Sequence, residues 1–293
     1  MPSPKAILLA ARPKTLPAAI VPVWTGSVLA WQLTGLFSWT LALCTLGSAI
    51  AIQIATNFFN DAIDDAKGAD TEARLGPTRV TASGLLPRKT VYLLATVFLV
   101  IASLLAIPLI EARGWIILAI GIPSLFLAYG YTGGPFPLAY LGLGEVFVVA
   151  FFGLIAVTGT VFVQTGAFHS EALWLGLTVG CLSAVLITIN NLRDIEEDTR
   201  SDKKTLAVRW GWEKASNLIR IEYIVAIISF YLTRSSPQMG DYLFAIFVLA
   251  FPAVRVISSV KNNGPSPALN GQLALAGMHL IFFAIAWTIL LAK

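Results

Sequence analysis

Residues 171–198 read EALWLGLTVGCLSAVLITINNLRDIEED, an apolar run that ends in carboxamide and acidic side chains. Residues 40–65 repeat this arrangement as TLALCTLGSAIAIQIATNFFNDAIDD. An apolar run of about 20 residues is long enough to cross the hydrocarbon core of a bilayer as a helix. Placing charged carboxylates at a membrane boundary costs free energy, so their presence there indicates a functional site. The two stretches therefore predict a membrane protein with a polar site.

The polar ends of the two runs share one spacing. Asn57-x3-Asp61-x3-Asp65 superposes on Asn190-x3-Asp194-x3-Asp198 with a constant offset of 133 residues. Charged helix ends are common in membrane proteins. The same spacing in both sets, and the asparagine side chains that both contain, nevertheless favour a functional site. A helix turns by about 100° per residue, and each set then shares one helix face: Asn57, Asn60, Asp61 and Asp64 in the first, and Asn190, Asp194 and Asp198 in the second.

The composition is that of an integral membrane protein. Hydrophobic residues make up 57% of the chain and charged residues 12%, against about 25% charged residues in soluble domains. We expect an all-α protein whose residues 1–293 form a single integral membrane domain, with polar cap loops at about 67–88 and 193–213. Nine membrane spans are predicted at about 17–35, 40–60, 90–110, 114–130, 143–163, 171–191, 215–233, 241–260 and 271–292.

Basic residues set the expected orientation. With nine spans, 16 of the 20 lysines and arginines fall on the side that holds the N-terminus and both acidic clusters. Lysine and arginine mark cytoplasmic loops, so we expect the N-terminus and both clusters on the cytoplasmic face of a bacterial cytoplasmic (inner) membrane. The basic loops are interleaved with acids and lack aromatic stacking platforms, which argues against nucleic acid as a partner.

Several motifs together resemble one family along most of the chain. In residue type and order, these motifs resemble those of the UbiA superfamily of intramembrane aromatic prenyltransferases. They resemble more closely those of its 1,4-dihydroxy-2-naphthoate branch. The motifs are Arg12-Pro-Lys-Thr-Leu-Pro17, Asn60-Asp61-x2-Asp64-x3-Gly68-x-Asp70, Gly76-Pro-x-Arg79, Tyr131-Thr-Gly-Gly-Pro135, Gly142-Leu-Gly144-Glu145, Asn190-Asn191-x2-Asp194-x3-Asp198 and Lys203-x-Thr205-Leu206-Ala207.

The resemblance implies a fold and a reaction. It implies nine transmembrane helices around a central cavity, a lateral opening to lipid and a cytoplasmic polar cap. The implied reaction transfers a polyprenyl or phytyl group from its diphosphate to 1,4-dihydroxy-2-naphthoate, with Mg²⁺ as cofactor and loss of CO₂ and diphosphate. The product would be demethylmenaquinone or demethylphylloquinone. Donor chain length stays open, as does oligomeric state.

The resemblance also assigns roles to residues. Asp61, Asp64, Asp194 and Asp198 are expected to be catalytic as metal and diphosphate ligands, with Asn57 and Asp65 as further metal ligands. The expected substrate-binding residues are Arg12, Lys67, Arg79, Tyr131, Asn190 and Lys203. Arg12 is either a partner for the carboxylate of the acceptor or a positive-inside anchor. Glu145 is either a buried polar contact or a catalytic group.

Three positions depart from the wider superfamily. Gly68 stands where many members have Asp, Pro135 stands where hydroxybenzoate enzymes have Lys, and Asp202 replaces a glycine of the naphthoate branch. The change at Pro135 argues against hydroxybenzoate as the acceptor. The alternatives are a prenyltransferase for another aromatic acceptor, such as hydroxybenzoate or homogentisate, and a secondary transporter. The crowding of ionisable residues at one face argues against a transporter, whose site normally lies near the midplane.

Overall fold

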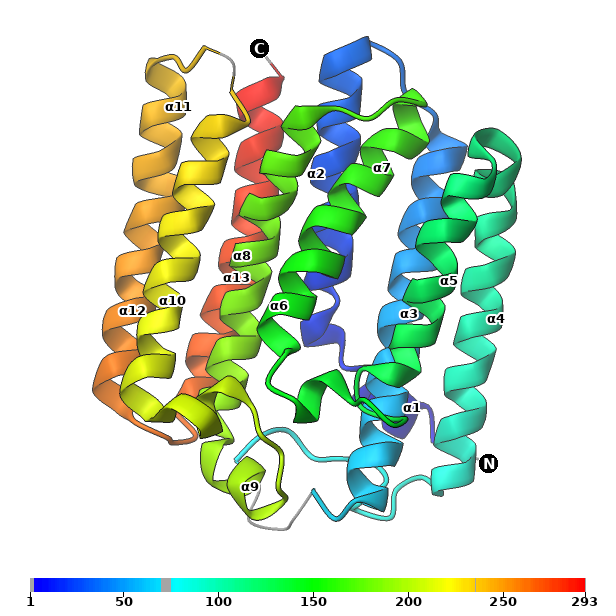
Figure 1. Ribbon diagram of the computed structural model, residues 1–293, viewed down its shortest axis with the longest axis vertical. Helices are drawn as coiled ribbons and strands as arrows, with labels where there is room; N and C mark the ends of the chain where they lie inside the picture. Colours follow the sequence, from blue (N-terminus) through cyan, green and yellow to red (C-terminus); the bar gives the residue numbers. More distant parts are fainter. Residues whose placement is uncertain (1–2, 70–74, 235, 293) are drawn as a thin grey trace.

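The chain forms a bundle of long helices in a computed structural model that describes residues 3–69, 75–234 and 236–292 (Figure 1). The described residues form helices and connecting segments, with no strand among them. In order, the elements are α1 (Pro4–Ala11), η1 (Pro13–Thr15), α2 (Pro17–Thr34), α3 (Trp39–Ala66), α4 (Arg88–Arg113), α5 (Trp115–Gly130), η2 (Leu138–Tyr140), α6 (Gly144–Val148), η3 (Val149–Ile155), α7 (Ala156–Thr165), α8 (Ser170–Arg193), α9 (Ile195–Arg200), α10 (Leu206–Leu232), α11 (Met239–Phe244), η4 (Ala245–Ala250), α12 (Phe251–Asn263) and α13 (Leu269–Leu291).

The predicted all-α membrane fold is confirmed, whereas the count of nine spans is not. Each of the nine predicted ranges is mainly helical. Among the described residues, seven helices are long and apolar enough to cross a membrane. An eighth is added if α1–η1 and α2, bent by 51°, count as one span. Helix α5 has 16 residues, so at about 1.5 Å per residue it is shorter than a bilayer core of about 30 Å.

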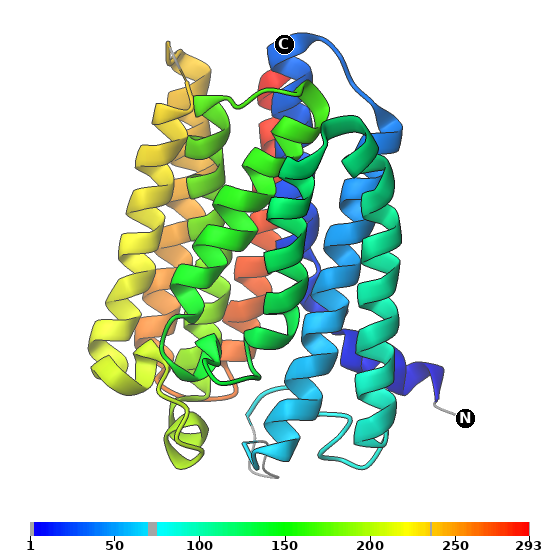
Figure 2. The same cartoon turned by 45° about the vertical axis from the view of Figure 1, so that its right-hand side comes forward.

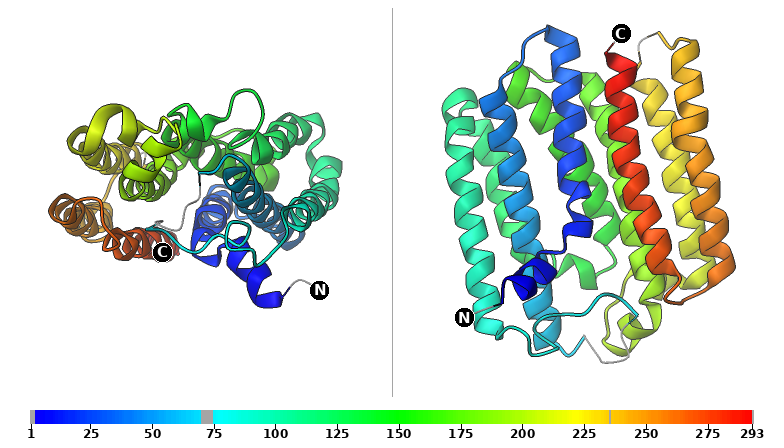
Figure 3. Two further views of the ribbon diagram at one scale, coloured as in Figure 1. Left: turned by 90° about the horizontal axis from the view of Figure 1, so that it is seen from below. Right: turned by 180° about the vertical axis from the view of Figure 1, so that it is seen from behind.

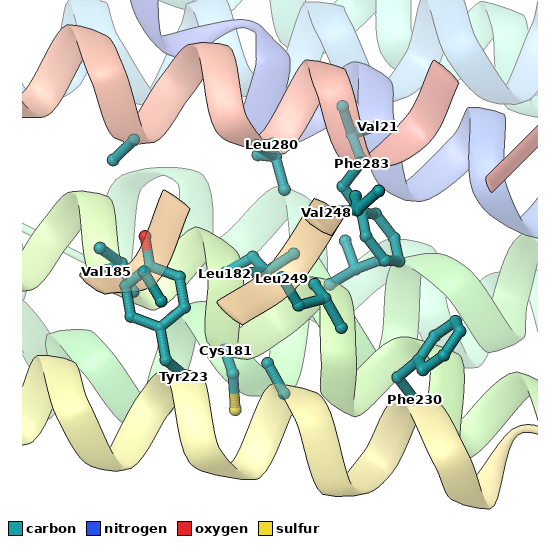
Figure 4. Close-up of a cluster of buried hydrophobic side chains, with 14 of the residues drawn as sticks. Val21, Cys181, Leu182, Val185, Tyr223, Phe230, Val248, Leu249, Leu280 and Phe283 are labelled. Atoms are coloured by element: carbon teal, nitrogen blue, oxygen red, sulfur yellow. The ribbon is translucent and has the colours of Figure 1, made fainter. Parts of the chain in front are cut away.

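The helix α8 is the central element. Within its apolar window, 72% of the residues are buried inside the protein, and it contacts α2, α7, α10, α13 and the π-helical segment η3. Figure 4 shows the core on this side, where side chains of α8, α10, η4 and α13 meet. A second, smaller core packs α1, α3, α4 and the segment before α4 through residues such as Phe58, Val80 and Val91. The two acidic motifs thus belong to different cores.

The contact between α8 and η3 is close because glycines form it. A Cβ on Gly153 would lie 2.4 Å from both the Gly176 carbonyl oxygen and the Gly180 Cα. Small residues let membrane helices approach until their backbones touch. This contact fixes the middle of the α6–η3–α7 span against the first half of α8.

Both acidic motifs lie at one end of the bundle. The end of α3, the end of α8, α9 and the short N-terminal helix α1 are at the bottom of Figure 1, and the C-terminus is at the top. The turned views in Figures 2 and 3 show the same arrangement, with residues 75–87 running across this lower end. Residues 193–213, expected as a loop, include α9 and the start of α10, which is broken at Gly211 with a φ of 76°.

Candidate functional site

A polar cavity of about 80 Å³ opens between the ends of α3 and α8. It is bounded by the N-terminal segment, both acidic motifs, the segment between α5 and α6, and the segment between α9 and α10. The lining residues are Arg12, Asn60, Asp64, Arg79, Tyr131, Thr132, Ala139, Gly142, Gly144, Glu145, Ile187, Asn190, Asn191, Lys203 and Thr205. Of the residues expected to bind substrate, Arg12, Arg79, Tyr131, Asn190 and Lys203 line this cavity.

Asp64 is the buried acid of the first motif that lines the cavity. Its Oδ2 accepts a hydrogen bond from Arg79 Nη2 at 3.2 Å, and its Oδ1 accepts one from the Tyr140 hydroxyl at 2.9 Å. The side chain of Asp64 is buried. Because Arg79 and Tyr140 come from two different segments, the carboxylate is held at both oxygens.

Asp61 and Asn57 bind backbone groups beside the cavity. Asp61 accepts hydrogen bonds from the backbone N–H groups of Val80 at 3.2 Å and Thr81 at 2.9 Å. Asn57 donates to the Ala11 carbonyl at 2.9 Å and to Thr15 Oγ1 at 3.0 Å. These contacts anchor residues 75–87 and the turn after α1 to the end of α3, so both side chains shape the walls of the site.

In the second motif, Arg193 holds Asp194 by two charge-assisted hydrogen bonds. Arg193 Nε lies 2.7 Å from Asp194 Oδ1, and Nη2 lies 2.6 Å from Oδ2. The same guanidinium donates to Asn190 Oδ1 and to Asn270 Oδ1, each at 2.8 Å. Two parallel bonds of this kind are strong and geometrically specific. Asp194 and Asn190 are therefore fixed by the last residue of α8.

Asp198 is the second-motif acid with a carboxylate oxygen left open. Its Oδ1 lies 3.4 Å from Lys203 Nζ, while its Oδ2 is buried and has no hydrogen-bond partner among the described residues. Burial raises the pKa of Asp198 to about 6, the nearby Lys203 opposes that rise, and the charges of Asp194 and Asp64 add to it. A buried polar atom without a partner is costly, so this oxygen is suited to a ligand.

Two lysines and an aromatic ring form the basic side of the site. Lys67 Nζ donates to the Thr132 carbonyl at 2.9 Å and lies 3.8 Å from the centre of the Tyr140 ring. Lys203 Nζ lies 5.7 Å from the same ring centre. Burial lowers the pKa of Lys67, with the charge of Asp64 opposing this and that of Lys203 adding to it. An anion between these ammonium groups would relieve their repulsion.

The loop that carries Tyr140 is held by its backbone. Lys204 N–H donates to the Tyr140 carbonyl at 3.1 Å. Gly142 has a φ of 70°, and a Cβ on it would lie 2.8 Å from the Lys204 carbonyl oxygen. Only glycine adopts this backbone conformation readily and also leaves room for that approach. The segment between α5 and α6 is thereby tied to the segment after the second motif.

Not all the expected metal ligands converge on the cavity. Asp65 binds Arg88 through two hydrogen bonds and is not among the described residues that line the cavity. In the part of the chain that the structure describes, no three His, Cys, Asp or Glu side chains are grouped so as to hold a metal ion. Asp70 and Arg74, which the sequence placed near the first motif, lie outside the described residues.

The donor atoms nevertheless fit a hard cation that is shared with a ligand. Asp64 and Asn60 on one side and Asp198 and Asn190 on the other offer carboxylate and carboxamide oxygens. Mg²⁺ is usually bound by one or two carboxylates together with waters and phosphate oxygens. Asp64 lines the cavity, and Asp198, whose Oδ2 is open, contacts the lining residue Lys203. These two carboxylates would be the protein groups for such a role.

Sequence analysis missed three residues of this site. Tyr140 links Asp64 to the two lysines, Thr132 hydrogen-bonds the Asn60 side chain, and Arg193 holds Asp194. Tyr140 and Thr132 lie in or next to the loop motifs quoted above, which is the signal that could have found them. Arg193 could not be distinguished from a positive-inside anchor because it lies where such anchors are common.

Known proteins resemble this chain along most of its length. The UbiA prenyltransferase family matches residues 19–269. The 1,4-dihydroxy-2-naphthoate octaprenyltransferase of Haemophilus influenzae is 36% identical over 288 residues, covering 94% of this chain and 93% of that protein. The protein of the same name from Bacillus subtilis is 33% identical and covers 92% of this chain and 87% of its own. A 2-carboxy-1,4-naphthoquinone phytyltransferase from Synechocystis is 30% identical, covering 94% and 89%.

Solved structures show the same fold at low sequence identity. A UbiA homolog from Archaeoglobus fulgidus bound to GPP and Mg²⁺ superposes with a TM-score of 0.69 at 16% identity, covering 98% of this chain and 100% of that chain. The apo structure of a UbiA homolog from Aeropyrum pernix K1 gives a TM-score of 0.71 at 14% identity, covering 92% and 96%.

Proposed function

Because this chain belongs to the UbiA prenyltransferase family, we propose that it transfers a polyprenyl or phytyl group from its diphosphate to 1,4-dihydroxy-2-naphthoate, with loss of CO₂ and diphosphate. The proposal is supported by the naphthoate octaprenyltransferases and the phytyltransferase that are 30–36% identical along the chain. The observation that carries it is the cavity in which Asp64 of the first motif, Asn190 and Asn191 of the second, and three basic side chains meet.

The diphosphate of the donor fits the basic side of the cavity. Lys67, Lys203 and Arg79 would donate hydrogen bonds to its oxygens, and charged donors hold phosphate groups strongly. Asp64 and Asp198 would hold Mg²⁺, which would supply positive charge against the departing diphosphate. Both acids are buried, so their charge acts in a medium that screens it weakly.

The aromatic acceptor and the allylic carbon fit the wall formed by α6 and η3. Tyr131 and Phe147 have ring centres 5.0 Å apart, and Phe147 stacks on Phe151 at 4.7 Å. This row of rings leads from the cavity along the span. Aromatic faces attract positive charge and exclude water, so they would protect a carbon that becomes cationic as the diphosphate departs. Arg12, which lines the cavity, would pair with the acceptor carboxylate.

The orientation in the membrane follows the basic residues. We infer a bacterial cytoplasmic membrane with the N-terminus, α9 and both motifs on the cytoplasmic side. The bias of lysines and arginines toward that end supports this assignment. The soluble diphosphate released by the reaction would then return directly to the cytoplasm.

An assay with a labelled acceptor tests the proposal. Purified protein is incubated with Mg²⁺, geranylgeranyl diphosphate and 1,4-dihydroxy-2-naphthoate labelled in its carboxyl group. We expect release of labelled CO₂ together with a prenylated naphthoquinol, which is detected as its quinone after oxidation by air, and no release when EDTA is present. Prenylation of hydroxybenzoate or homogentisate instead would reassign the acceptor. No turnover with any aromatic acceptor and several donor lengths would contradict the proposed function.

A further inference from the structure

A second carboxylate faces the cavity and has no role in the site described so far. Glu145, in the first turn of α6, is 5% exposed and lines the cavity. Its Oε1 accepts a hydrogen bond from Asn191 Nδ2 at 2.9 Å. Its Oε2 is buried and has no hydrogen-bond partner among the residues that the structure describes. The side chain is therefore held at one oxygen and left open at the other.

An open buried carboxylate oxygen indicates a ligand with a hydrogen-bond donor. Leaving such an oxygen without a partner destabilises the protein, and a bound donor group would offset that cost. No described Lys, Arg or His side chain forms a salt bridge with Glu145. Asn191 already donates a hydrogen bond to Oε1, so Oε2 is the oxygen of Glu145 that can accept one from a ligand.

The chemistry of the two substrates decides which one this oxygen can bind. A prenyl diphosphate is an anion with oxygen acceptors and an apolar chain, and it offers no donor to a carboxylate. The proposed acceptor carries two ring hydroxyl groups, and each is a donor. Its carboxylate is an acceptor and suits the guanidinium of Arg12, another lining residue. A ring hydroxyl is thus the group that suits Glu145.

The surroundings of Glu145 also suit an aromatic ring. A Cβ on Gly144 would lie 3.0 Å from the Tyr131 hydroxyl, so this phenol lies against the start of α6. Burial, and next to it the charge of Glu145, raises the pKa of Tyr131, which keeps the phenol neutral. The ring of Tyr131 continues into Phe147 and Phe151. An acceptor placed beside these rings would bring its hydroxyl to the carboxylate.

Resting on the proposed function, we propose that Glu145 binds a ring hydroxyl of the aromatic acceptor and takes its proton during prenyl transfer. The O–H bond breaks and its proton goes to Oε2, while its electron pair enters the ring. The ring carbon forms the new C–C bond with the allylic carbon, and the C–O bond to diphosphate breaks with its electrons on the leaving group. Glu145 is a catalytic residue for the acceptor and not for the donor.

A neighbouring glutamate supplies a matched control. Glu222 of α10 is also buried and accepts a hydrogen bond from α8, from Thr188 at 2.7 Å, with its Oε2 lacking a described partner. Thr188 lies three residues before Asn191, which binds Glu145. Glu222 is absent from the described lining of the cavity. The two glutamates thus share burial and attachment but differ in access to the cavity.

The test compares Glu145→Gln with Glu222→Gln. Glutamine keeps an oxygen acceptor but is a poor proton acceptor, and general-base catalysis is worth about 10²–10⁴-fold. For Glu145→Gln we expect a kcat at least about 100-fold lower, with an unchanged KM for the donor diphosphate. For Glu222→Gln we expect wild-type kinetics. Wild-type kcat in Glu145→Gln, or an equal loss in both variants, would overturn the proposal.

A binding measurement separates this inference from the proposed function. Affinities for 1,4-dihydroxy-2-naphthoate and for 2-naphthoate, which lacks the hydroxyls, are measured by calorimetry without donor. Wild-type protein should prefer the dihydroxy compound by about 10-fold or more, and Glu145→Ala should lose that preference. An unchanged preference in Glu145→Ala would overturn the role of Glu145. If another phenol proves to be the acceptor, the affinity of that phenol is compared in the same way with the affinity of its analogue without the hydroxyl group.

Discussion

The Tyr140 hydroxyl lies 2.9 Å from Asp64 Oδ1, and the ring of the same tyrosine lies 3.8 Å below Lys67 Nζ. One side chain therefore contacts both the acidic and the basic side of the site. The hydroxyl orients a proposed metal ligand, and the π face supports an ammonium group that is expected to bind diphosphate. Tyr140 couples the two halves of the donor site although it comes from neither acidic motif.

The two functions of Tyr140 can be separated by substitution. Tyr140→Phe keeps the ring and removes the hydrogen bond to Asp64, which is worth about 1.5–3 kcal/mol for a charged acceptor. We expect the apparent Mg²⁺ affinity to fall about tenfold or more, and Tyr140→Leu to weaken donor binding further. Titration of activity with Mg²⁺ and with donor measures both. Equal behaviour of the Phe and Leu variants would assign the whole effect to the hydroxyl.

Neighbouring acids at the end of α3 should differ sharply in importance. Asp64 faces the cavity, whereas Asp65 is paired with Arg88. We expect Asp64→Asn to lower kcat/KM for the donor by about 10³-fold or more, as for loss of a preorganised charge at the reacting centre. Asp65→Asn should stay within a few-fold of wild type. Steady-state kinetics checks the pair, and similar losses in both would restore Asp65 as a ligand.

Arg12 should act on the acceptor and not on the donor. It lines the cavity and follows α1 at a φ of 52°, a conformation that sets it apart from an ordinary helical anchor. We expect Arg12→Gln to raise the KM for 1,4-dihydroxy-2-naphthoate about tenfold or more, because a charge-assisted contact with its carboxylate is lost. The KM for the donor should not change. An equal rise in both values would reduce Arg12 to a membrane anchor.

The glycine contact between η3 and α8 should be needed for stability. Gly153→Ala would place a methyl group 2.4 Å from backbone atoms of α8, and overpacking costs about 1–3 kcal/mol. We expect a lower unfolding temperature in detergent, followed by intrinsic fluorescence. Gly121→Ala is the control, since a Cβ there meets nothing within 4 Å. A Gly153→Ala variant as stable as Gly121→Ala would contradict the rigid contact.

Much of the fold could be predicted from the sequence alone, because membrane-spanning helices are recognised by their long runs of apolar residues. The family, the all-α class and the gathering of both motifs at one end follow from composition, the shared spacing and the motif order. The bend before α2 and the short α5 could not be predicted, because hydropathy reports apolar length and not where a helix turns.

The side-chain partners within the site were beyond the sequence. Spacing predicted that Asp61 and Asp64 share a helix face and that Asp194 shares one with Asp198. It could not show that Asp61 binds backbone amides or that Asp194 is held by Arg193. Val80 and Thr81 belong to a segment folded back over the end of α3, whereas Arg193 is the residue directly before Asp194. Asp61 and Asp65 occupy adjacent turns of the same helix, so sequence spacing does not distinguish them. The hydrogen bond from Arg88 of α4 shows that Asp65 is paired with that helix.

The hydrogen bonds from Val80 and Thr81 to Asp61 make the segment at the lower end of α3 a competitor for any cation at that carboxylate. By linkage, whatever strengthens one interaction weakens the other by the same free energy. Loading the site with metal and donor should therefore change how firmly residues 75–87 are held. The rate of amide hydrogen exchange at Val80 and Thr81 would then report whether the site is occupied, without any turnover.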